Sequence, residues 1–233
     1  MTVLMTNEVY LAEQGEGPAL GERCIFLRLA NCNLRCSFCD TKYALDWTLY
    51  DRSVEEHSTP IGELRDQLRH LSLRTGIRLV IVTGGEPCLQ SLALYDLMTD
   101  MPEMTFDLET AGTIYPGDPM MARLRHVVVS PKLLSSGNEG RRPIRIPVLS
   151  EFAKWPKTAF KFVIGDGYDV EEAVDLLTVL RRQPKDNVWF MPMGTTAEQM
   201  AVMNPRVRQW ADQYGARFSP RRHIELYGAR RGV

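Results

Sequence analysis

Three cysteines lie close together in the first fifth of the sequence. Residues 31–40 read NCNLRCSFCD, so that three residues separate Cys32 from Cys36 and two separate Cys36 from Cys39. A disulfide framework pairs its thiols, and a structural zinc site usually has four ligands. Cysteine thiolates are the usual ligands of a [4Fe–4S] cluster, and a set of three leaves one iron open to another ligand. The spacing therefore favours an iron–sulfur site, and the alternative is a zinc site completed by a distant His or Cys.

A pair of glycines follows a predicted buried strand. Residues 78–85 read RLVIVTGG and run into TGGEP at 83–87. Glycine has no β-carbon, so the backbone amide and carbonyl groups of such a turn stay open to a ligand. Alone, a glycine pair after a strand indicates only a tight turn. Together with the cysteine loop, it indicates a second part of the same cofactor site.

The two segments resemble the signature of the radical S-adenosylmethionine (SAM) superfamily. The Cys-x₃-Cys-x₂-Cys spacing resembles its cluster loop, and TGGEP resembles its second motif. The resemblance implies that the amino and carboxylate groups of SAM bind the open iron. It also implies that an electron from the reduced cluster splits the sulfonium to give a 5′-deoxyadenosyl radical.

Six further segments resemble one family within this superfamily, the 7-carboxy-7-deazaguanine synthases. The resemblance implies conversion of 6-carboxy-5,6,7,8-tetrahydropterin to 7-carboxy-7-deazaguanine with loss of ammonia, on the route to queuosine and related 7-deazapurines. It also implies a Mg²⁺ ion, a homodimer and a low-potential electron donor such as flavodoxin or ferredoxin. The segments are QGEG (14–17), FLRL (26–29), CDT (39–41), ETAGT (109–113), SPK (130–132) and the ending SPRRHIELYGARRGV (219–233).

The chemistry of four side chains fits such a substrate. Glu16 can accept hydrogen bonds from the exocyclic amine and a ring N–H of a pterin, and Gln14 can complete that edge. Arg28 suits the substrate carboxylate because its planar fork binds carboxylates in a bidentate manner, although a surface arginine with a buried stem is the alternative. The hydroxyl of Thr41 suits Mg²⁺, which prefers oxygen ligands and water, and a helix-capping role is the alternative.

The family resemblance extends these candidates to three sets of residues. The cluster ligands are Cys32, Cys36 and Cys39, and the magnesium ligand is Thr41. The candidates for SAM binding are Phe38, Cys39, Asp40, Gly85, Glu86, Ser130, Pro131 and Lys132. The candidates for substrate binding are Glu13, Gln14, Gly15, Glu16, Arg28, Thr83, Glu109 and His223, of which His223 has an ordinary structural role as its alternative.

Alternating strands and helices must position these residues. Apolar runs predict strands at 23–30, 78–85, 105–110, 126–132, 160–166 and 187–194. Helical periodicity starts at Pro60, with Thr59 as the cap, and recurs at 92–98, 170–180 and 196–214. About six parallel strand–helix units predict an α/β fold of the partial (β/α) barrel type, and a doubly wound sheet is the alternative. Residues 1–233 are expected to form one domain with its cluster loop at 31–41, and the polar stretch 133–157 to form a loop.

Composition limits the partners. The 233 residues include 28 Lys and Arg against 29 Asp and Glu, so charge indicates neither nucleic acid nor an anionic membrane. The sequence has no run of eighteen apolar residues and no N-terminal signal pattern, and its five cysteines indicate a reducing cytoplasm. Cys24 and Cys88 are expected in the core. The arginines at 221, 222, 230 and 231 suit a phosphate, an acidic partner or a solvated face.

One other enzyme class shares the first two motifs. A radical SAM activating enzyme, which makes a glycyl radical on a partner protein, also has a cysteine loop and a GGEP-like turn. The QGEG and CDT segments favour a small pterin site instead. An activating enzyme would need an open groove for a peptide and would have no use for a magnesium ligand after the third cysteine.

Overall fold

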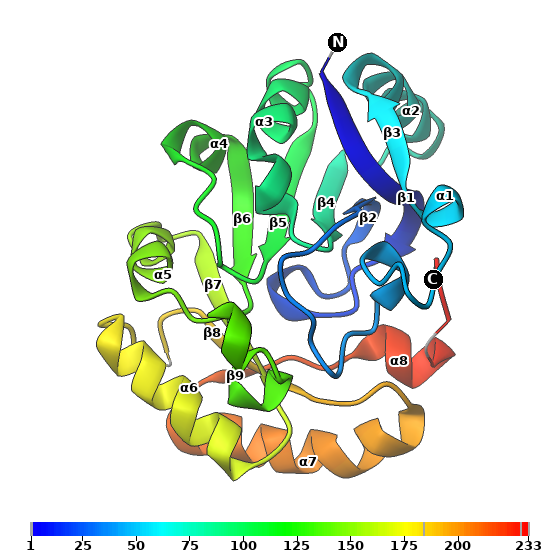
Figure 1. Ribbon diagram of the computed structural model, residues 1–233. Helices are drawn as coiled ribbons and strands as arrows, with labels where there is room; N and C mark the ends of the chain where they lie inside the picture. The colour runs from blue at the N-terminus through cyan, green and yellow to red at the C-terminus, as the bar shows by residue number, and fades with distance from the viewer. Residues whose placement is uncertain (1, 184, 229, 233) are drawn as a thin grey trace.

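The computed structural model describes residues 2–183, 185–228 and 230–232, and its centre is a nine-stranded sheet (Figure 1). The strand order is β3-β1-β2-β4-β5-β6-β7-β8-β9, with parallel neighbours from β2 to β9. Strand β1 is antiparallel to both β2 and β3. The strands are β1 (Val3–Glu13), β2 (Arg23–Leu29), β3 (His57–Pro60), β4 (Leu79–Gly84), β5 (Thr105–Thr110), β6 (Leu124–Val129), β7 (Thr158–Ile164), β8 (Val188–Pro192) and β9 (Arg217–Phe218).

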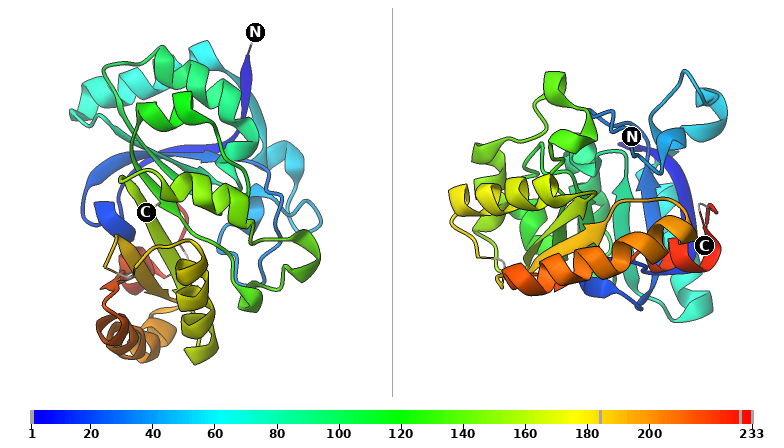
Figure 2. Two further views of the ribbon diagram at one scale, coloured as in Figure 1. Left: turned by 90° about the vertical axis from the view of Figure 1, so that its left-hand side faces the viewer. Right: turned by 90° about the horizontal axis from the view of Figure 1, so that it is seen from below.

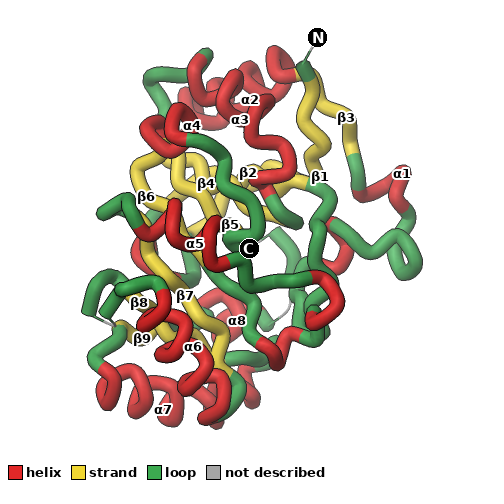
Figure 3. Tube along the Cα trace, turned by 60° about the vertical axis from the view of Figure 1, so that its left-hand side comes forward, coloured by secondary structure: helices red, strands yellow, loops and turns green. Residues whose placement is uncertain are grey.

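Helices connect the parallel strands and surround the sheet, as the views in Figure 2 and the red segments of Figure 3 show. Each parallel strand from β2 to β8 leads through at least one helix to the next parallel strand, which is the usual crossover connection. Within the described ranges, no helix is both long and apolar enough to cross a membrane. The helices are α1 (Arg52–Glu55), α2 (Ile61–Thr75), α3 (Ser91–Thr99), α4 (Asp118–Arg123), α5 (Ile146–Ala153), α6 (Gly167–Val179), α7 (Ala197–Tyr214) and α8 (Arg222–Tyr227).

The α/β class and the partial barrel of six strand–helix units are confirmed. Strands β2, β4, β5, β6, β7 and β8 provide the six units, and among the described residues the sheet stays open between β3 and β9. Two local expectations are wrong. Thr59 does not cap α2, because it belongs to β3 and its hydroxyl lies 2.7 Å from that of Thr6. The stretch 133–157 is not only loop, because it contains α5.

Alternate side chains of each parallel strand face opposite sides of the sheet. In β7, Phe160 and Phe162 pack into the main hydrophobic core beneath the helices, whereas Lys161 lies on the opposite face and lines a pocket. In β2, Leu27 packs into that core and Arg28 lines the pocket. Because side chains alternate along a strand, a polar residue inside an apolar run reaches the inner face without interrupting the core.

Candidate active site

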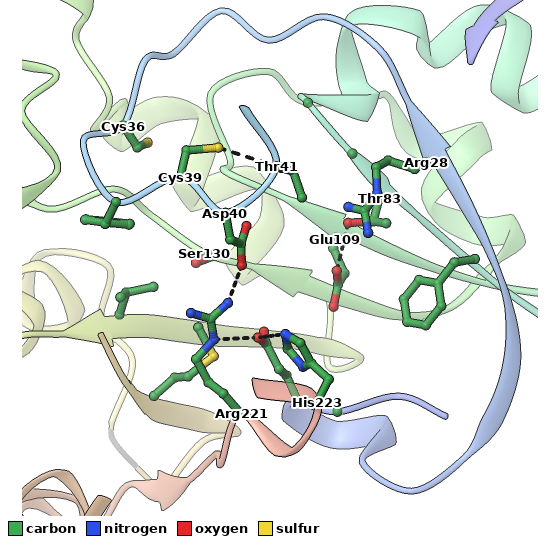
Figure 4. Close-up of a pocket in the computed structure, with 18 of the residues that line it drawn as sticks. Arg28, Cys36, Cys39, Asp40, Thr41, Thr83, Glu109, Ser130, Arg221 and His223 are labelled. Atoms are coloured by element: carbon green, nitrogen blue, oxygen red, sulfur yellow. Dashed lines mark hydrogen bonds and ion pairs between the residues drawn. The ribbon is translucent and has the colours of Figure 1, made fainter. Parts of the chain in front are cut away.

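The carboxyl ends of the parallel strands surround one pocket (Figure 4). The cysteine loop follows β2, the glycine turn ends β4, and Ser130 follows β6. Loops at this edge of a parallel sheet are the usual place for an active site. All the candidate site residues named from the sequence line this pocket except Glu86 and Pro131.

The cysteine loop and the glycine turn are packed against each other. The amide of Gly85 donates to the carbonyl of Leu29 over 2.9 Å, and the amide of Glu86 donates to that of Asn31 over 2.9 Å. A β-carbon on Gly84 would overlap the backbone of Leu29, and one on Gly85 would overlap that of Asn31. The two glycines are therefore required for the close contact between these segments, in addition to any contact with a ligand.

The three thiols of the cysteine loop are partly buried in the pocket wall. Burial raises the pKa of Cys32 to about 12 and also raises the pKa of Cys39. Two nitrogen donors contact the sulfurs: the amide of Leu34 lies 3.4 Å from Cys32 Sγ, and Nδ2 of Asn138 lies 3.2 Å from Cys36 Sγ. Such donors stabilise bound thiolates and tune the metal that they hold.

The other two cysteines lie in the protein interior, as expected. Cys24 is 0% exposed and Cys88 is 2% exposed. Neither lines the pocket. Both are core residues, and this leaves the cysteine loop as the thiol-bearing wall of the site.

The carboxylate of Glu86 is turned away from the pocket. It is 0% exposed and accepts hydrogen bonds from the amide of Cys88 (3.0 Å), the hydroxyl of Thr110 (2.6 Å) and the amide of Ala111 (2.9 Å). These contacts join the end of β4 to the end of β5. Although the sequence indicated Glu86 for SAM binding, its side chain fixes the two strand ends and only its backbone adjoins the cofactor turn.

A cluster of buried charges forms the wall opposite the cysteine loop. Glu16 is paired with Lys161 Nζ (2.6 Å) and Arg221 Nε (3.0 Å), and His223 Nε2 lies 3.8 Å away. Arg221 also pairs with Asp40, which connects this wall to the cysteine loop. Burial alone would raise the pKa of Glu16, but the neighbouring cations of Lys161 and Arg221 hold it far below its usual range.

A second carboxylate, that of Glu109, is oriented by neutral donors. The Gln14 side-chain amide donates to it over 3.1 Å. The Thr83 hydroxyl donates to its other oxygen over 2.9 Å (Figure 4). Its distance from Lys161 Nζ is 3.9 Å, which is longer than that of the Glu16 pair. The edge formed by Gln14, Thr83 and Glu109 presents several hydrogen-bonding groups to the same space.

Arg28 lies between two rings and a carboxylate. Its Nε donates to Glu8 over 2.7 Å and its Nη2 donates to the hydroxyl of Tyr10 over 2.8 Å. Its guanidinium carbon lies 5.9 Å from the centre of the Tyr43 ring. These contacts hold the side chain in one orientation in the lining of the pocket, and Nη1 has no hydrogen-bond partner among the described residues. The alternative of a surface arginine does not hold.

Thr41 adjoins the third cysteine. Its hydroxyl lies 3.7 Å from Cys39 Sγ and lines the pocket. It precedes the 3₁₀ turn Lys42–Ala44 but makes no side-chain capping bond to it. The hydroxyl is therefore available to the pocket.

Two residues of the charged wall were not singled out from the sequence. Lys161 lies inside the apolar strand β7, where its alternation with phenylalanines was a usable signal for the inner face. Arg221 was considered only as part of the terminal arginines, and the solvated-face alternative is wrong for it because it is 5% exposed. By contrast, Arg222 next to it is exposed and pairs with Glu13 over 3.0 Å.

Comparisons with known proteins agree with this site. The radical SAM superfamily matches residues 28–201 of the chain. The 7-carboxy-7-deazaguanine synthase of Pyrobaculum aerophilum is 35% identical over 97% of this chain and 95% of its own. That of Hyperthermus butylicus is 34% identical over 96% of this chain and 92% of its own. The chain belongs to the 7-carboxy-7-deazaguanine synthase family of radical SAM proteins.

A solved structure agrees with this synthase fold. The crystal structure of QueE from Escherichia coli matches with a TM-score of 0.65 and 23% identity, over 94% of this chain and 93% of that one. At this identity the similarity concerns the fold. It supports the partial-barrel fold.

As a radical SAM family member, the synthase uses a [4Fe–4S] cluster and SAM, and the cysteine loop fits such a cluster. Among the described residues, no three His, Cys, Asp or Glu side chains gather closely enough to hold a single metal ion. Cys32, Cys36 and Cys39 nevertheless line the same pocket, as ligands of three different irons must. The donor set is purely thiolate, which suits iron–sulfur ligation.

Proposed function

We propose that the protein is a radical SAM lyase that converts 6-carboxy-5,6,7,8-tetrahydropterin to 7-carboxy-7-deazaguanine with loss of ammonia, in the biosynthesis of queuosine or a related 7-deazapurine. The observation that carries the proposal is the polar edge of Gln14, Thr83 and Glu109 opposite the cysteine loop. The names and the near full-length coverage of the relatives from Pyrobaculum aerophilum and Hyperthermus butylicus support it.

Glu109 is the better candidate for the guanine-like edge of the pterin. A carboxylate can accept both the exocyclic amine and a ring N–H in a bidentate pair. Glu16 was expected in this role, but both of its oxygens are paired with buried cations, those of Lys161 and Arg221. Glu109 is oriented by neutral donors, and its contact with a cation is longer. Glu16 then holds the cations of the wall in place.

The substrate carboxylate has a cation and a hydroxyl available. Arg28 lines the pocket, and Glu8 and Tyr10 accept hydrogen bonds from its Nε and Nη2 but not from its Nη1. Thr41 would provide one oxygen ligand to a Mg²⁺ ion, with the substrate carboxylate and water providing others. His223 and Gly15 complete this part of the wall, and Glu13 lies at its rim.

The SAM side of the pocket is formed by the other candidates. When bound, the cluster and SAM supply the one-electron chemistry that begins with removal of a hydrogen atom from the substrate. Phe38 and Asp40 lie on the cysteine loop, and Ser130 accepts a hydrogen bond from Lys132 Nζ over 2.8 Å. Gly85 and Lys132 thereby border the same space from two strand ends. These residues would hold and orient SAM beside the pterin.

Several finer features belong to the same proposal. We expect one domain, a homodimer, a cytoplasmic location and a low-potential electron donor such as flavodoxin or ferredoxin. The free thiols of all five cysteines suit a reducing compartment. The glycyl-radical activating role is not favoured, because the relatives that match this chain over nearly its full length are synthases.

The decisive experiment is an anaerobic activity assay. The reconstituted protein is incubated with SAM, Mg²⁺, dithionite and 6-carboxy-5,6,7,8-tetrahydropterin, and mass spectrometry follows 7-carboxy-7-deazaguanine. Product that depends on SAM supports the proposal. Formation of 5′-deoxyadenosine without any deazaguanine would keep the superfamily chemistry and exclude the pterin substrate.

A further inference from the structure

Part of the cysteine loop is exposed at the protein surface, and the segment 133–145 packs against one side of this loop. The amide of Ser37 donates to the carbonyl of Ser136 over 3.0 Å, and the amide of Arg35 donates to Asn138 Oδ1 over 2.7 Å. Figure 1 shows this green turn, between β6 and α5, beside the blue loop that follows β2. The two segments therefore form one continuous surface next to the cluster site.

This surface carries four exposed arginines, which we call the arginine face: Arg35, Arg141, Arg142 and Arg145. None of them forms an ion pair with a described residue. By sequence the segment 133–145 holds one acid, Glu139, and the carboxylate of Glu172 from α6 is occupied by the amide of Leu134 at 2.9 Å.

An apolar groove adjoins the arginine face. Leu134 is 64% exposed, which is unusual for a leucine beside a functional loop. The groove is lined mainly by apolar residues, with Lys132, two arginines and Glu172 among them, and a mixture of apolar and charged groups is typical of a small protein–protein interface. Its lining includes Leu134, Pro143, Ile144, Ile146, Pro147 and Val148, together with Arg142 and Arg145.

One side chain connects this surface to a cluster ligand. Asn138 is 2% exposed, and while its Oδ1 accepts from the amide of Arg35, its Nδ2 contacts Cys36 Sγ at 3.2 Å. Asn138 therefore contacts both the backbone of Arg35, on the arginine face, and the sulfur of Cys36. The arginine face is therefore suited to a partner that transfers an electron toward Cys36 without entering the substrate pocket.

We propose that the arginine face and its groove are the docking surface for an acidic, low-potential redox protein that delivers one electron to the cluster at its Cys36 corner. The inference rests on the proposed function, which requires such a donor. In the transfer the reduced donor loses one electron and the cluster gains it, and no bond forms or breaks. Opposite charges steer such partners together and confer specificity. The phosphates of a nucleic acid could also bind the arginines, but they would make no favourable contact with the apolar groove.

The test compares two pairs of charge reversals. The first pair, Arg141→Glu with Arg142→Glu, changes the arginine face. The control pair, Arg78→Glu with Arg181→Glu, changes two exposed arginines that precede β4 and β8, near the amino ends of the strands and away from the pocket. Calorimetry measures binding of an oxidised acidic flavodoxin to each reconstituted protein at low and high salt. We expect the arginine-face variant to bind at least about tenfold more weakly and to lose most of the salt dependence, since rim charges set steering and its screening. The control pair should bind as the unchanged protein does.

Reduction of the cluster provides a second measurement. Stopped-flow absorbance follows oxidation of the flavodoxin hydroquinone, which should slow in the arginine-face variant, while dithionite should reduce both proteins at the same rate. Equal flavodoxin affinity and equal reduction rates in the two variants would overturn the docking proposal. The docking proposal would also be overturned if the arginine-face variant kept its reduction rate with flavodoxin but no longer bound a tRNA probe. That result would indicate that the arginine face binds nucleic acid. Failure of the dithionite-driven protein to make product would count against the proposed function and not against the docking surface.

Discussion

Glu16 is the residue on which the cations of the pocket converge. It holds Lys161 at 2.6 Å and Arg221 at 3.0 Å, and both of these side chains are almost fully buried. Buried cations are costly unless they are paired, so Glu16 is needed for the wall to exist in its present form. Its first role is therefore to fix the electrostatics of the site.

This role predicts how acid affects stability. In the unfolded chain Glu16 takes up a proton near the ordinary glutamate pKa of 4.5, whereas in the folded protein its cationic neighbours keep it ionised to much lower pH. A depressed folded pKa contributes stability above the unfolded pKa and loses that contribution as pH falls toward the folded pKa. Glu16→Gln should lower the free energy of unfolding at pH 7 by about 3 kcal/mol, because it leaves two buried cations short of an anion.

The pH dependence of that difference is the check. Urea unfolding of both proteins at pH 7, 5 and 4 should show the gap shrinking below about pH 4.5, because the unfolded carboxyl becomes protonated only there. A gap that stays constant over this range would contradict the depressed pKa of Glu16.

Arg28 gives a prediction for catalysis. If its free Nη1 binds the substrate carboxylate, Arg28→Ala should reduce product formation by at least about thirtyfold, the size expected when one partner of a buried charge pair is removed. Cleavage of SAM to 5′-deoxyadenosine should continue, because the cysteine loop is untouched. Arg78→Ala, at an exposed position, is the matched control. Parallel loss of product and of 5′-deoxyadenosine would place Arg28 in the SAM site instead.

At the scale of elements, the turn after β1 is closely packed against the start of α8. The amide of Arg222 donates to the carbonyl of Gly15 over 3.0 Å. A β-carbon on Gly15 would lie 2.5 Å from Nδ1 of His223 and 3.1 Å from its backbone nitrogen. The absence of a side chain at Gly15 therefore sets the position of His223 in the pocket.

Gly15→Ala should displace α8 and His223. We expect a loss of about 1–3 kcal/mol in the free energy of unfolding, as for other overpacked sites, and weaker substrate binding. Gly167→Ala is the control, because its added β-carbon meets no atom within 4 Å. Thermal unfolding and the KM for the pterin measure both effects, and equal values for the two variants would show that the turn can move without consequence.

The elements differed in how well the sequence predicted them. Apolar runs such as 78–85 gave the parallel strands within a few residues, because strands buried on both faces are continuous in hydrophobicity. Strand β1 was missed because polar residues interrupt its apolar pattern. It is held in the sheet by antiparallel pairing with β2 and β3, and this pairing cannot be predicted from the sequence of β1 itself. The cysteine loop needed no tertiary information, since its three thiols lie within eight residues of the sequence.

The charged wall depended on tertiary contacts that sequence separation conceals. Lys161 and Glu16 are 145 residues apart, and Arg221 and Glu16 are 205 apart. A lysine in β7 could be assigned to one of two faces, but which face lines a pocket depends on the curvature and order of the whole sheet. Arg221 is buried only because α8 returns to the turn after β1. The proposal of Glu109 in place of Glu16 at the pterin edge depends on the same long-range contacts, because the sequence alone does not show the cationic partners of Glu16.

At the scale of the whole molecule, Arg231 ties the C-terminal segment to the first strand. It pairs with Glu55 at 2.7 Å and with Glu8 at 3.2 Å, and its guanidinium carbon lies 3.9 Å from the centre of the Tyr43 ring. Glu8 in turn pairs with Arg28. The segment that lines the pocket is therefore held against β1, α1 and the loop after the cysteines.

Arg231→Ala should loosen this segment. We expect KM for the pterin to rise up to about fivefold with kcat little changed, because a partly exposed ion pair contributes at most about 1 kcal/mol. Hydrogen exchange should also rise in α8. Arg206→Ala, an exposed position on α7, should change neither quantity. A fall in kcat without a change in KM would mean that Arg231 acts on the chemistry and not on the pocket wall.

The pairing of Glu16 with Arg221 also sets an order of events during synthesis. The ribosome releases the cysteine loop, the glycine turn and strands β1 to β8 before Arg221 and His223 emerge. A nascent chain that has reached only β8 thus holds every thiol of the cluster site, while Glu16 and Asp40 still lack one of their cations. Translation therefore completes the thiol-bearing wall of the pocket first and the charged wall last. A ribosome that stalled near residue 215 would leave a chain with all three thiols of the cysteine loop but without Arg221 and His223.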